Sequence, residues 1–360
     1  MKLYQPVRPA LHALRRLMPR IAALALLSAM AAPVWAAAPV LRVLAWPGYA
    51  DPAVVKSFEQ RHGVRVEVTV IDSDTALWRR ISADDAAYDV FAVNAAELQR
   101  YIALNLLQAA DPARIPNTAR QLPRFRNLAS IPGLVHQGHA YGIPYTYSEM
   151  GLIYDRRQIA TPPQSIAALW DPRYHGKVLA YDGGTHNFSL AAQLLKTSNP
   201  FRLAPADWPR AVDRLIDMRR NVLGFYSQPE ESVQLFMRHG AALMFANYGM
   251  QQVHLLKAAG ADIGYAIPRE GALSWLDCWA ITRRARDPAL AHAWIDHLLG
   301  DQASDLLATR QGLANTIAES DVSRGDNRLL WLEPVEDAEL RDRLWQRIRS
   351  GDRASRVLAP

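Results

Sequence analysis

The fold of this chain is decided by the stretch LRVLAWPGYADPAVVKSFEQRHGVRVEVTV, residues 41–70. Its first six and last seven residues are rich in branched apolar side chains and predict two β-strands. Between them, Asp51-Pro52 is typical of a helix start, Val54, Val55 and Phe58 recur at helical spacing, and Gly63 ends the helix. Two strands joined by a helix over so short a stretch predict a βαβ unit and a parallel sheet.

The same alternation of strands and helices continues after this unit. Residues 75–82 predict a helix, residues 88–93 predict a strand that ends at Asn94, and a further helix starts at Ala95. In open α/β sheets, ligands bind beyond the carboxyl ends of the strands. Trp46 and Asn94 both follow strands, so we expect them at the binding edge.

A second α/β series begins near residue 142. It comprises predicted strands at 141–147, 150–154, 177–180, 241–246 and 274–281, and predicted helices from about 188, at 208–220 and at 288–300. No repeat or low-complexity linker separates the two series. The sequence therefore predicts an α/β protein of two domains with a hinge and an interdomain ligand cleft.

Residues 1–36 have the pattern of a secretory signal peptide. Five basic residues precede an apolar run at 21–30, and Val34-Trp35-Ala36 offers small side chains to a signal peptidase, with cleavage expected after Ala36. The run is shorter than the roughly 18 apolar residues of a membrane anchor. Cys278 is the only cysteine, so no thiol near the cleavage site is available for lipid attachment. We expect a monomeric periplasmic protein that is not membrane-anchored.

Charge and motif content exclude several function classes. The chain has 41 Lys+Arg against 35 Asp+Glu, and removing the five basic residues of the leader leaves 36 against 35. This balance gives no reason to expect a nucleic-acid partner. His136 and His139 lack a third ligand nearby, so no metal or cofactor is expected. No G-x-S-x-G elbow or P-loop motif is present. We therefore expect that the protein is not an enzyme, and a secreted hydrolase remains the alternative.

Five motifs carry a family resemblance. They are WPGY at 46–49, AYDV at 87–90, YGIPY at 141–145, LWDPRYHGKV at 169–178 and WLD at 275–277. In order and spacing they resemble the periplasmic spermidine/putrescine-binding proteins, the substrate-capturing subunits of ABC importers. The resemblance covers about residues 40–320. It implies a small amine-bearing ligand and inner-membrane permease subunits as partners.

The resemblance also implies domain boundaries. The first domain would take residues 40–147 and return for 277–322. The second would take 148–276 and 323–360.

A polyamine site needs aromatic walls for the methylene stem and carboxylates for the ammonium groups. Trp46 and Tyr49 match family aromatics, and Trp275 and Asp277 match a family pair in which the aspartate binds a ligand amine. Residues two apart in a strand share a face, so Trp275 and Asp277 should lie together. Core packing remains the alternative for the tryptophans, and a structural arginine remains an alternative partner for the aspartate. The remaining ligand-binding candidates are Asn94, Tyr147, Asp182, His186, Ser227 and Asn247.

The departures from the family pattern concern charge and aromatic content. Gly48, Gly183 and His186 stand where family members carry acids, and Ala96 and Ala246 stand where they carry aromatics. One clear carboxylate cannot neutralise two or three ammonium groups. The sequence therefore favours a ligand with one cation over spermidine or putrescine.

Three alternatives stay open at this stage. Asp182, Glu230 or Glu149 would restore the missing charge from a shifted position. The N–H groups of Gly183-Gly184, before the helix expected near Phe188, would suit an anionic group on the ligand. A ligand-sensing binding protein of the same fold has the same cleft features as a transport protein.

Overall fold

The computed structural model describes residues 1, 38–83, 85, 87–318 and 329–359. The leader and its expected cleavage site after Ala36 lie outside these residues. The chain divides into the units Met1–Pro39 and Val40–Pro360, and the second unit contains every element described below. Within the described residues, no helix combines the length and apolar character that a membrane span requires.

The first sheet of the Val40–Pro360 unit has the strand order β14-β7-β13-β3-β1-β2, with β4 and β15 also paired to β13. Its strands are β1 (Val40–Ala45), β2 (Arg65–Val70), β3 (Val90–Asn94), β4 (Leu107–Gln108), β7 (Ile143–Met150), β13 (Ala272–Thr282), β14 (Ala314–Asn315) and β15 (Leu329–Trp331). Strand β1 is parallel to β2 and β3, so their carboxyl ends meet at one edge of the sheet. Strand β13 is antiparallel to both β3 and β7.

The second sheet has the strand order β10-β9-β11-β8-β12. Its strands are β8 (Leu152–Asp155), β9 (Val178–Tyr181), β10 (Val222–Tyr226), β11 (Leu243–Phe245) and β12 (Ile263–Ala266). The chain passes from the first sheet to the second between β7 and β8 and returns between β12 and β13. A short β5 (Val135–His136) pairs with β6 (His139–Ala140).

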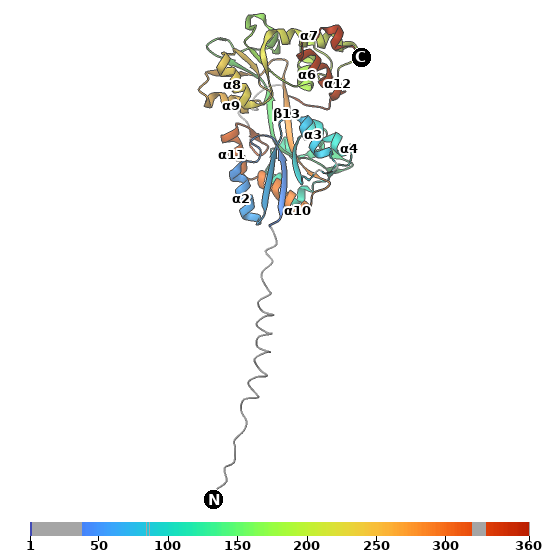
Figure 1. Ribbon diagram of the computed structural model, residues 1–360, viewed down its shortest axis with the longest axis vertical. Coiled ribbons are helices and arrows are strands. Elements are labelled where there is room, and N and C mark those ends of the chain that lie inside the picture. The colour runs from blue at the N-terminus through green and yellow to red at the C-terminus, as the bar shows by residue number, and fades with distance from the viewer. Residues whose placement is uncertain (2–37, 84, 86, 319–328, 360) are drawn as a thin grey trace. The chain divides into compact units, whose positions relative to one another are not determined.

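Two groups of helices cover the sheets. Those packed with the first sheet are α2 (Pro52–His62), α3 (Asp74–Ser82), α4 (Ala95–Ala103), α5 (Pro123–Arg126), α10 (Pro288–Leu298) and α11 (Asp301–Gln311). Those grouped with the second are α6 (Gly184–Leu195), α7 (Trp208–Asn221), α8 (Pro229–His239), α9 (Met250–Ala258), α12 (Ala338–Arg349) and α13 (Ala354–Val357). Figure 1 shows the two groups, with β13 running between them.

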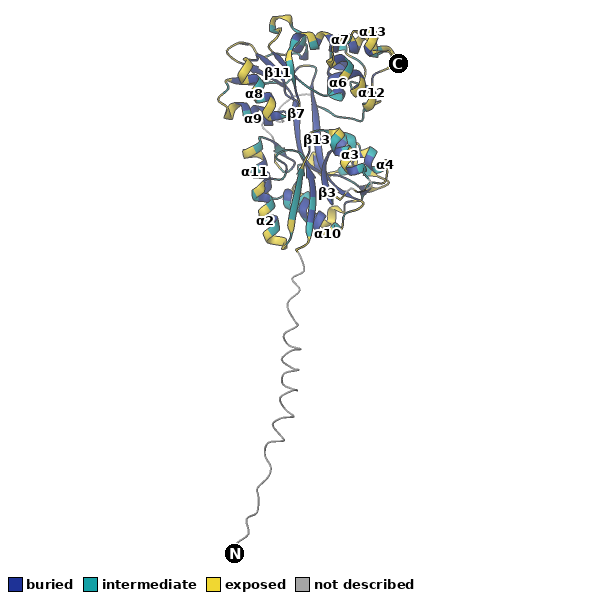
Figure 2. Cartoon of the chain, viewed as in Figure 1, coloured by how far each residue is buried: buried dark blue, intermediate teal, exposed yellow. Residues whose placement is uncertain are grey.

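The first sheet is buried on both faces, as its strand sequences require. Leu44, Phe91 and Cys278 face the cluster under α3 and α4, whereas Val43 and Trp279 face the cluster under α2 and α10. Neighbouring residues of a strand point to opposite faces. Every residue of β7 and β13 is buried, and Figure 2 shows both strands in the colour of buried residues. Cys278 is therefore a buried apolar side chain, and burial raises the pKa of its thiol.

The second sheet is also enclosed by apolar side chains. Ile153, Leu179 and Met244 pack with α8 and α9, and helices α6, α7, α12 and α13 build a separate cluster around Phe188 and Trp345. The C-terminal α12 thus lies against α6 and forms part of the second group of helices. This contact decides which side chains of α12 reach the site described below.

The α/β fold is confirmed, and most expected elements are present. One helix start is wrong: α6 begins at Gly184, not near Phe188. The Gly-Gly pair disfavours a helix locally, but a Cβ at Gly184 would lie 2.7 Å from the Arg341 carbonyl oxygen, so the close packing of α12 requires glycine there. The domain boundaries given above stay a prediction.

Candidate ligand-binding pocket

A cavity of about 490 Å³ lies where the two groups of elements meet. The first group lines it with residues that follow β1, β2 and β3, and with Trp275 and Asp277 of β13. The second group lines it with residues that follow β9 and β11, and with one face of α12. The walls therefore come largely from the carboxyl ends of parallel strands, where α/β proteins bind ligands.

Asp277 is a buried carboxylate in this cavity, 7% exposed. The Tyr49 hydroxyl donates to its Oδ2 at 2.6 Å, and Asn94 Nδ2 donates to its Oδ1 at 3.1 Å. Both donors are neutral. Burial raises the pKa of Asp277 to about 6, against the lowering effect of these two hydrogen bonds. No ion pair to Asp277 occurs in the described part of the chain, which leaves a cationic ligand group as its natural counter-charge.

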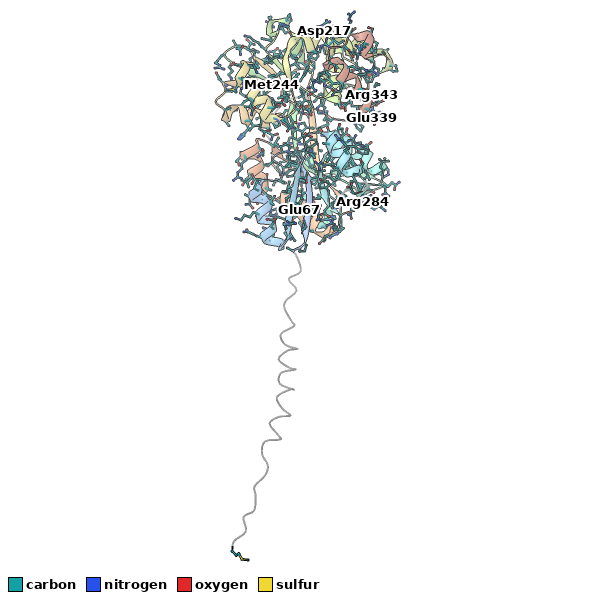
Figure 3. The ribbon with its side chains drawn as sticks, in the orientation of Figure 1. Glu67, Asp217, Met244, Arg284, Glu339 and Arg343 are labelled. Carbon is teal, nitrogen blue, oxygen red and sulfur yellow. The ribbon has the colours of Figure 1, made fainter. Side chains whose placement is uncertain are left out.

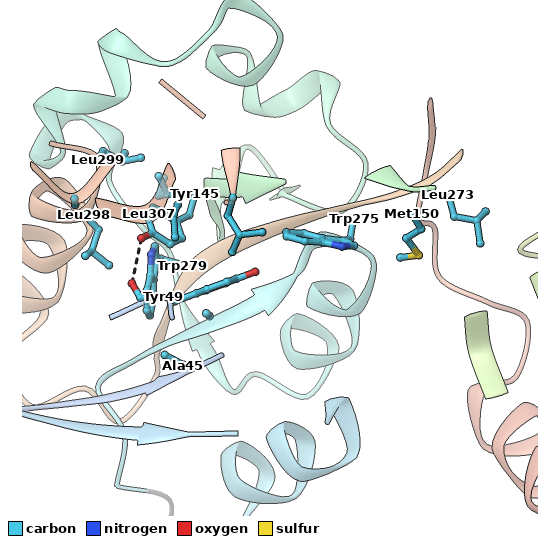
Figure 4. Packing of buried hydrophobic residues seen from close by; sticks show 14 of the residues in the cluster. Ala45, Tyr49, Tyr145, Met150, Leu273, Trp275, Trp279, Leu298, Leu299 and Leu307 are labelled. Atoms are coloured by element: carbon cyan, nitrogen blue, oxygen red, sulfur yellow. Dashed lines mark hydrogen bonds between the residues drawn. The ribbon is translucent and has the colours of Figure 1, made fainter. Parts of the chain in front are cut away.

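Aromatic rings surround this carboxylate. Trp46, Tyr49 and Trp275 line the cavity, and Trp275 Nε1 donates to the Asn247 carbonyl at 3.1 Å. Tyr49 packs edge-on against Tyr145, whose hydroxyl donates to the Tyr49 carbonyl at 3.1 Å, as Figure 4 shows. Tyr49 and Trp275 are therefore held in place by hydrogen bonds to neighbouring parts of the chain. Such an arrangement suits the apolar stem and the charge of an organic cation.

His186 and Asn247 form a neutral pair on the opposite wall. His186 Nδ1 lies 2.7 Å from Asn247 Oδ1. Burial lowers the pKa of His186 to about 4, so the ring is neutral at pH 7. Because an amide oxygen only accepts, Nδ1 carries the proton and Nε2 keeps its lone pair. The His186 side chain is thus suited to accept a hydrogen bond from an N–H group.

Asp182 also lines the cavity, but the protein itself neutralises it. Arg349 Nη1 lies 2.6 Å from its Oδ2, and Trp345 Nε1 donates to its Oδ1 at 2.8 Å. Both partners belong to α12 or its end. The two carboxylates proposed from the sequence therefore differ: Asp182 has a cationic partner and Asp277 has only neutral donors.

Four further carboxylates line the cavity and were missed from the sequence: Asp74, Glu97, Glu333 and Asp342. Asp74 opens α3 and Glu97 lies in the first turn of α4, directly after β2 and β3. Asp342 projects from α12. Burial and the neighbouring Glu97 and Asp277 raise the pKa of Asp74 to about 7. The expectation of one clear carboxylate is therefore wrong, because acids from positions outside the family motifs enter the site.

Not every predicted residue reaches the cavity. Tyr147 is buried against Phe125 and Trp331 and accepts a hydrogen bond from Arg124 Nη2. Ser227 is exposed beyond β10, where its carbonyl accepts from the Tyr248 hydroxyl. Neither belongs to the lining, nor do Glu149 and Glu230. Trp46, Tyr49, Asn94, Asp182, His186, Asn247, Trp275 and Asp277 do line it.

Two glycine positions bear on the expected acids. Gly48 has φ +82°, a backbone conformation that side chains rarely adopt, so an acidic residue there would be strained. At the start of α6, the Asp342 carboxylate lies beside Gly184, whose N–H lowers the pKa that burial raises. The anion site proposed at this helix end therefore already faces the protein's own acid.

Residues 53–324 match the family model described as bacterial extracellular solute-binding protein. The chain belongs to this family. The match covers most of the chain and includes the whole second sheet and all strands of the first sheet except β1 and β15. The pocket described above thus lies in a solute-binding protein.

Curated relatives and solved structures agree with this assignment. The chain is 26% identical to the putrescine/agmatine-binding protein of Pseudomonas aeruginosa over 88% of this chain and 94% of the relative. It is 24% identical to the spermidine/putrescine-binding periplasmic protein of Escherichia coli over 74% of each. The structure of the spermidine/putrescine ABC transporter substrate-binding protein of Streptococcus pneumoniae has a TM-score of 0.65 and 19% identity, covering 83% of this chain and 93% of that one. This last likeness supports the fold.

Proposed function

We propose that this solute-binding protein captures a polyamine-like organic cation in the pocket and passes it to the permease of an ABC importer. The observation that carries the proposal is Asp277, a buried carboxylate without a cationic partner among the described residues, set among aromatic rings. An ammonium group would supply the missing positive charge, and the rings would contact the methylene stem.

The remaining polar groups of the pocket fit the same ligand class. His186 presents a lone pair instead of a charge, and the lining contains six carboxylates against the single guanidinium of Arg100, counted over the described residues. Such a pocket repels an anionic group. This charge balance argues against the alternative of a ligand with one cation and one anionic group.

Transport also requires a protein that reaches the periplasm and changes shape with its ligand. The named relative from Escherichia coli is periplasmic, and the leader pattern of residues 1–36 supports the same destination. Two domains, at about 40–147 with 277–322 and 148–276 with 323–360, would close over the ligand and exclude water, which strengthens the charge interactions. The protein would act as a monomer without an enzymatic step.

A thermal-shift and calorimetric screen of the chain from Ala37 onward tests the proposal. Putrescine, spermidine and agmatine should raise the melting temperature, because a ligand that binds only the folded state stabilises it. Amino acids and dicarboxylates serve as controls and should have no effect. A screen in which dicarboxylates stabilise the protein and amines do not would contradict the proposal.

A further inference from the structure

Arg341 of α12 is a fully buried arginine that lies outside the lining of the pocket. Its Nε and Nη2 donate to the two carboxylate oxygens of Glu336 at 2.9 and 2.8 Å. On the other side of the guanidinium, Nη1 donates to the Thr185 carbonyl at 3.0 Å and to Ser189 Oγ at 2.9 Å. Arg341 thus fastens α12 to the first turns of α6, with the positive end of its ion pair toward α6.

Stability alone does not account for an arginine at this place. The same two helices build the apolar cluster around Phe188 and Trp345. Burying a guanidinium and a carboxylate carries a large desolvation cost, and apolar side chains of similar volume are often as stable or more stable. The partners of Arg341 on α6 therefore indicate what its charge and its hydrogen bonds contribute.

The partner that connects Arg341 to the pocket is Thr185. Thr185 and His186 are consecutive residues of α6, and both line the cavity. On the side of β11, His186 Nδ1 lies 2.7 Å from Asn247 Oδ1. The backbone before the imidazole and the ring itself are thus both fixed by hydrogen bonds. This arrangement leaves Nε2 of His186 for the ligand.

The charge of Arg341 also acts on the protonation of His186. Burial and, after it, the positive charge of Arg341 lower the pKa of His186 to about 4, against the raising effect of the hydrogen bond to Asn247. The titratable side chains that β9, β11 and α12 bring to the same wall are Tyr181, Asp182, Tyr248 and Asp342. Negative charge favours a protonated histidine. Arg341 therefore opposes the effect of the acids on this wall.

We propose that Arg341 is a positioning residue of the pocket, which fixes the first turn of α6 through the Thr185 carbonyl and keeps His186 a neutral acceptor for an N–H group of the ligand. This inference rests on the proposed function, which assigns an amine ligand to the pocket. Arg341 does not touch the ligand and acts through Thr185 and His186. The C-terminal helix α12 thereby controls the chemistry of a wall that α6 provides.

A double-mutant cycle tests whether Arg341 acts through His186. Wild type, Arg341→Met, His186→Ala and the double variant are titrated calorimetrically with putrescine. Each single variant should lose about tenfold in affinity, and the double variant should lose less than about threefold more, because the two changes remove the same interaction. Losses that multiply, or wild-type affinity in Arg341→Met, would overturn the role of Arg341 and leave the proposed function standing. Wild type that binds no amine would overturn both.

The His186 ring provides a second readout, which a merely structural role of Arg341 would not change. Nitrogen NMR of the ring in the wild-type protein should show the proton on Nδ1 and no titration between about pH 5.5 and 8. In Arg341→Met, the ring should titrate within this range or carry its proton partly on Nε2. Ring signals equal to those of wild type would contradict the proposed role.

A second variant guards against a folding defect, because Arg341→Met leaves the charge of Glu336 without its partner. Arg341→Met combined with Glu336→Gln removes both charges, and the glutamine oxygen can still accept the Leu203 N–H that Glu336 Oε2 accepts at 3.2 Å. This variant should fold and show the same loss of putrescine affinity and the same ring signals as Arg341→Met. Wild-type affinity in it would overturn the role of Arg341.

Arg343→Met is the matched control. It lies on α12, two residues after Arg341, with its side chain 60% exposed and its Nη1 3.8 Å from Glu339 Oε2. Figure 3 labels both Arg343 and Glu339. This variant should bind putrescine and show His186 ring signals as wild type does. A loss equal to that of Arg341→Met would mean that any positive charge on α12 has the same effect, which would contradict a specific role of Arg341.

Discussion

The two acidic regions of the pocket differ in how the protein treats their charge. Around Asp277, two neutral donors and a buried setting hold a single carboxylate in the middle of the long interior strand β13. In the acidic cluster, which consists of Asp74, Glu97 and Asp342, three carboxylates on helices share one guanidinium. The first region therefore places one carboxylate deep in the pocket in a fixed orientation, whereas the second contributes net negative charge.

The largest effect is expected where the charge is most buried. Asp277→Asn keeps the shape of the side chain and removes its charge, so the affinity for every amine should fall about 30-fold or more, about 2 kcal/mol. Calorimetric titration measures it. Asp217→Asn on the exposed surface of α7 is the control and should bind normally. Unaltered affinity in Asp277→Asn would show that Asp277 is structural.

The same substitution should not destabilise the empty protein. The pKa of Asp277 is raised in the folded state, so its contribution favours folding at acidic pH and is lost as the pH rises through about 6. At pH 8, Asp277→Asn should therefore have a free energy of unfolding equal to or higher than that of wild type, measured by urea denaturation. A clear loss of stability would mean that the ionised carboxylate has a stabilising partner.

Ligand affinity should depend on pH in a way that involves both regions. In the empty pocket the pKa is about 6 for Asp277 and about 7 for Asp74, and a bound ammonium group lowers both. Binding then displaces protons below about pH 7, and diamine affinity should fall by up to about 100-fold between pH 7.5 and 5.5. The amines themselves stay charged over this range. A flat profile would indicate that both acids are already ionised.

The aromatic wall should contribute less than the buried charge. Trp46→Leu keeps apolar volume but removes the ring, so amine affinity should fall about fivefold, in keeping with a cation–π contact of about 1 kcal/mol. The melting temperature of the empty protein is the control measurement. An affinity equal to that of wild type would place Trp46 in core packing.

The smallest effect on binding is expected at Asp182. Asp182→Asn breaks the ion pair with Arg349, whose side chain is 49% exposed, and should cost at most about 1 kcal/mol of stability. Amine affinity should change less than about threefold, because Asp182 is neutralised before the ligand arrives. A loss as large as that of Asp277→Asn would make Asp182 a ligand contact and remove the contrast between them.

The residues predicted correctly for the pocket lining share a local signal. Trp46, Tyr49 and Asn94 follow parallel strands, and Trp275 and Asp277 have the two-residue spacing of one strand face. These signals depend on neighbours in the sequence, so a single chain is enough to detect them. Their roles toward a ligand stay predictions that the experiments above address.

The missed acids divide into two kinds. Asp74 and Glu97 follow β2 and β3, so the rule used for Asn94 would have found them, but they lie outside the family motifs. Asp342 gave no local signal, because its place in the pocket depends on α12 packing against α6, far away in the sequence. The same packing explains the early start of α6 at Gly184.

A crystal structure of the protein with bound spermidine tests the central claim most directly. The account predicts one ammonium nitrogen about 3 Å from a carboxylate oxygen of Asp277, with the stem against Trp46 and Trp275. A second nitrogen should lie within the acidic cluster, near Asp74, Glu97 or Asp342. Spermidine bound with no nitrogen at Asp277, or with its second charge held by Asp182, would contradict the account.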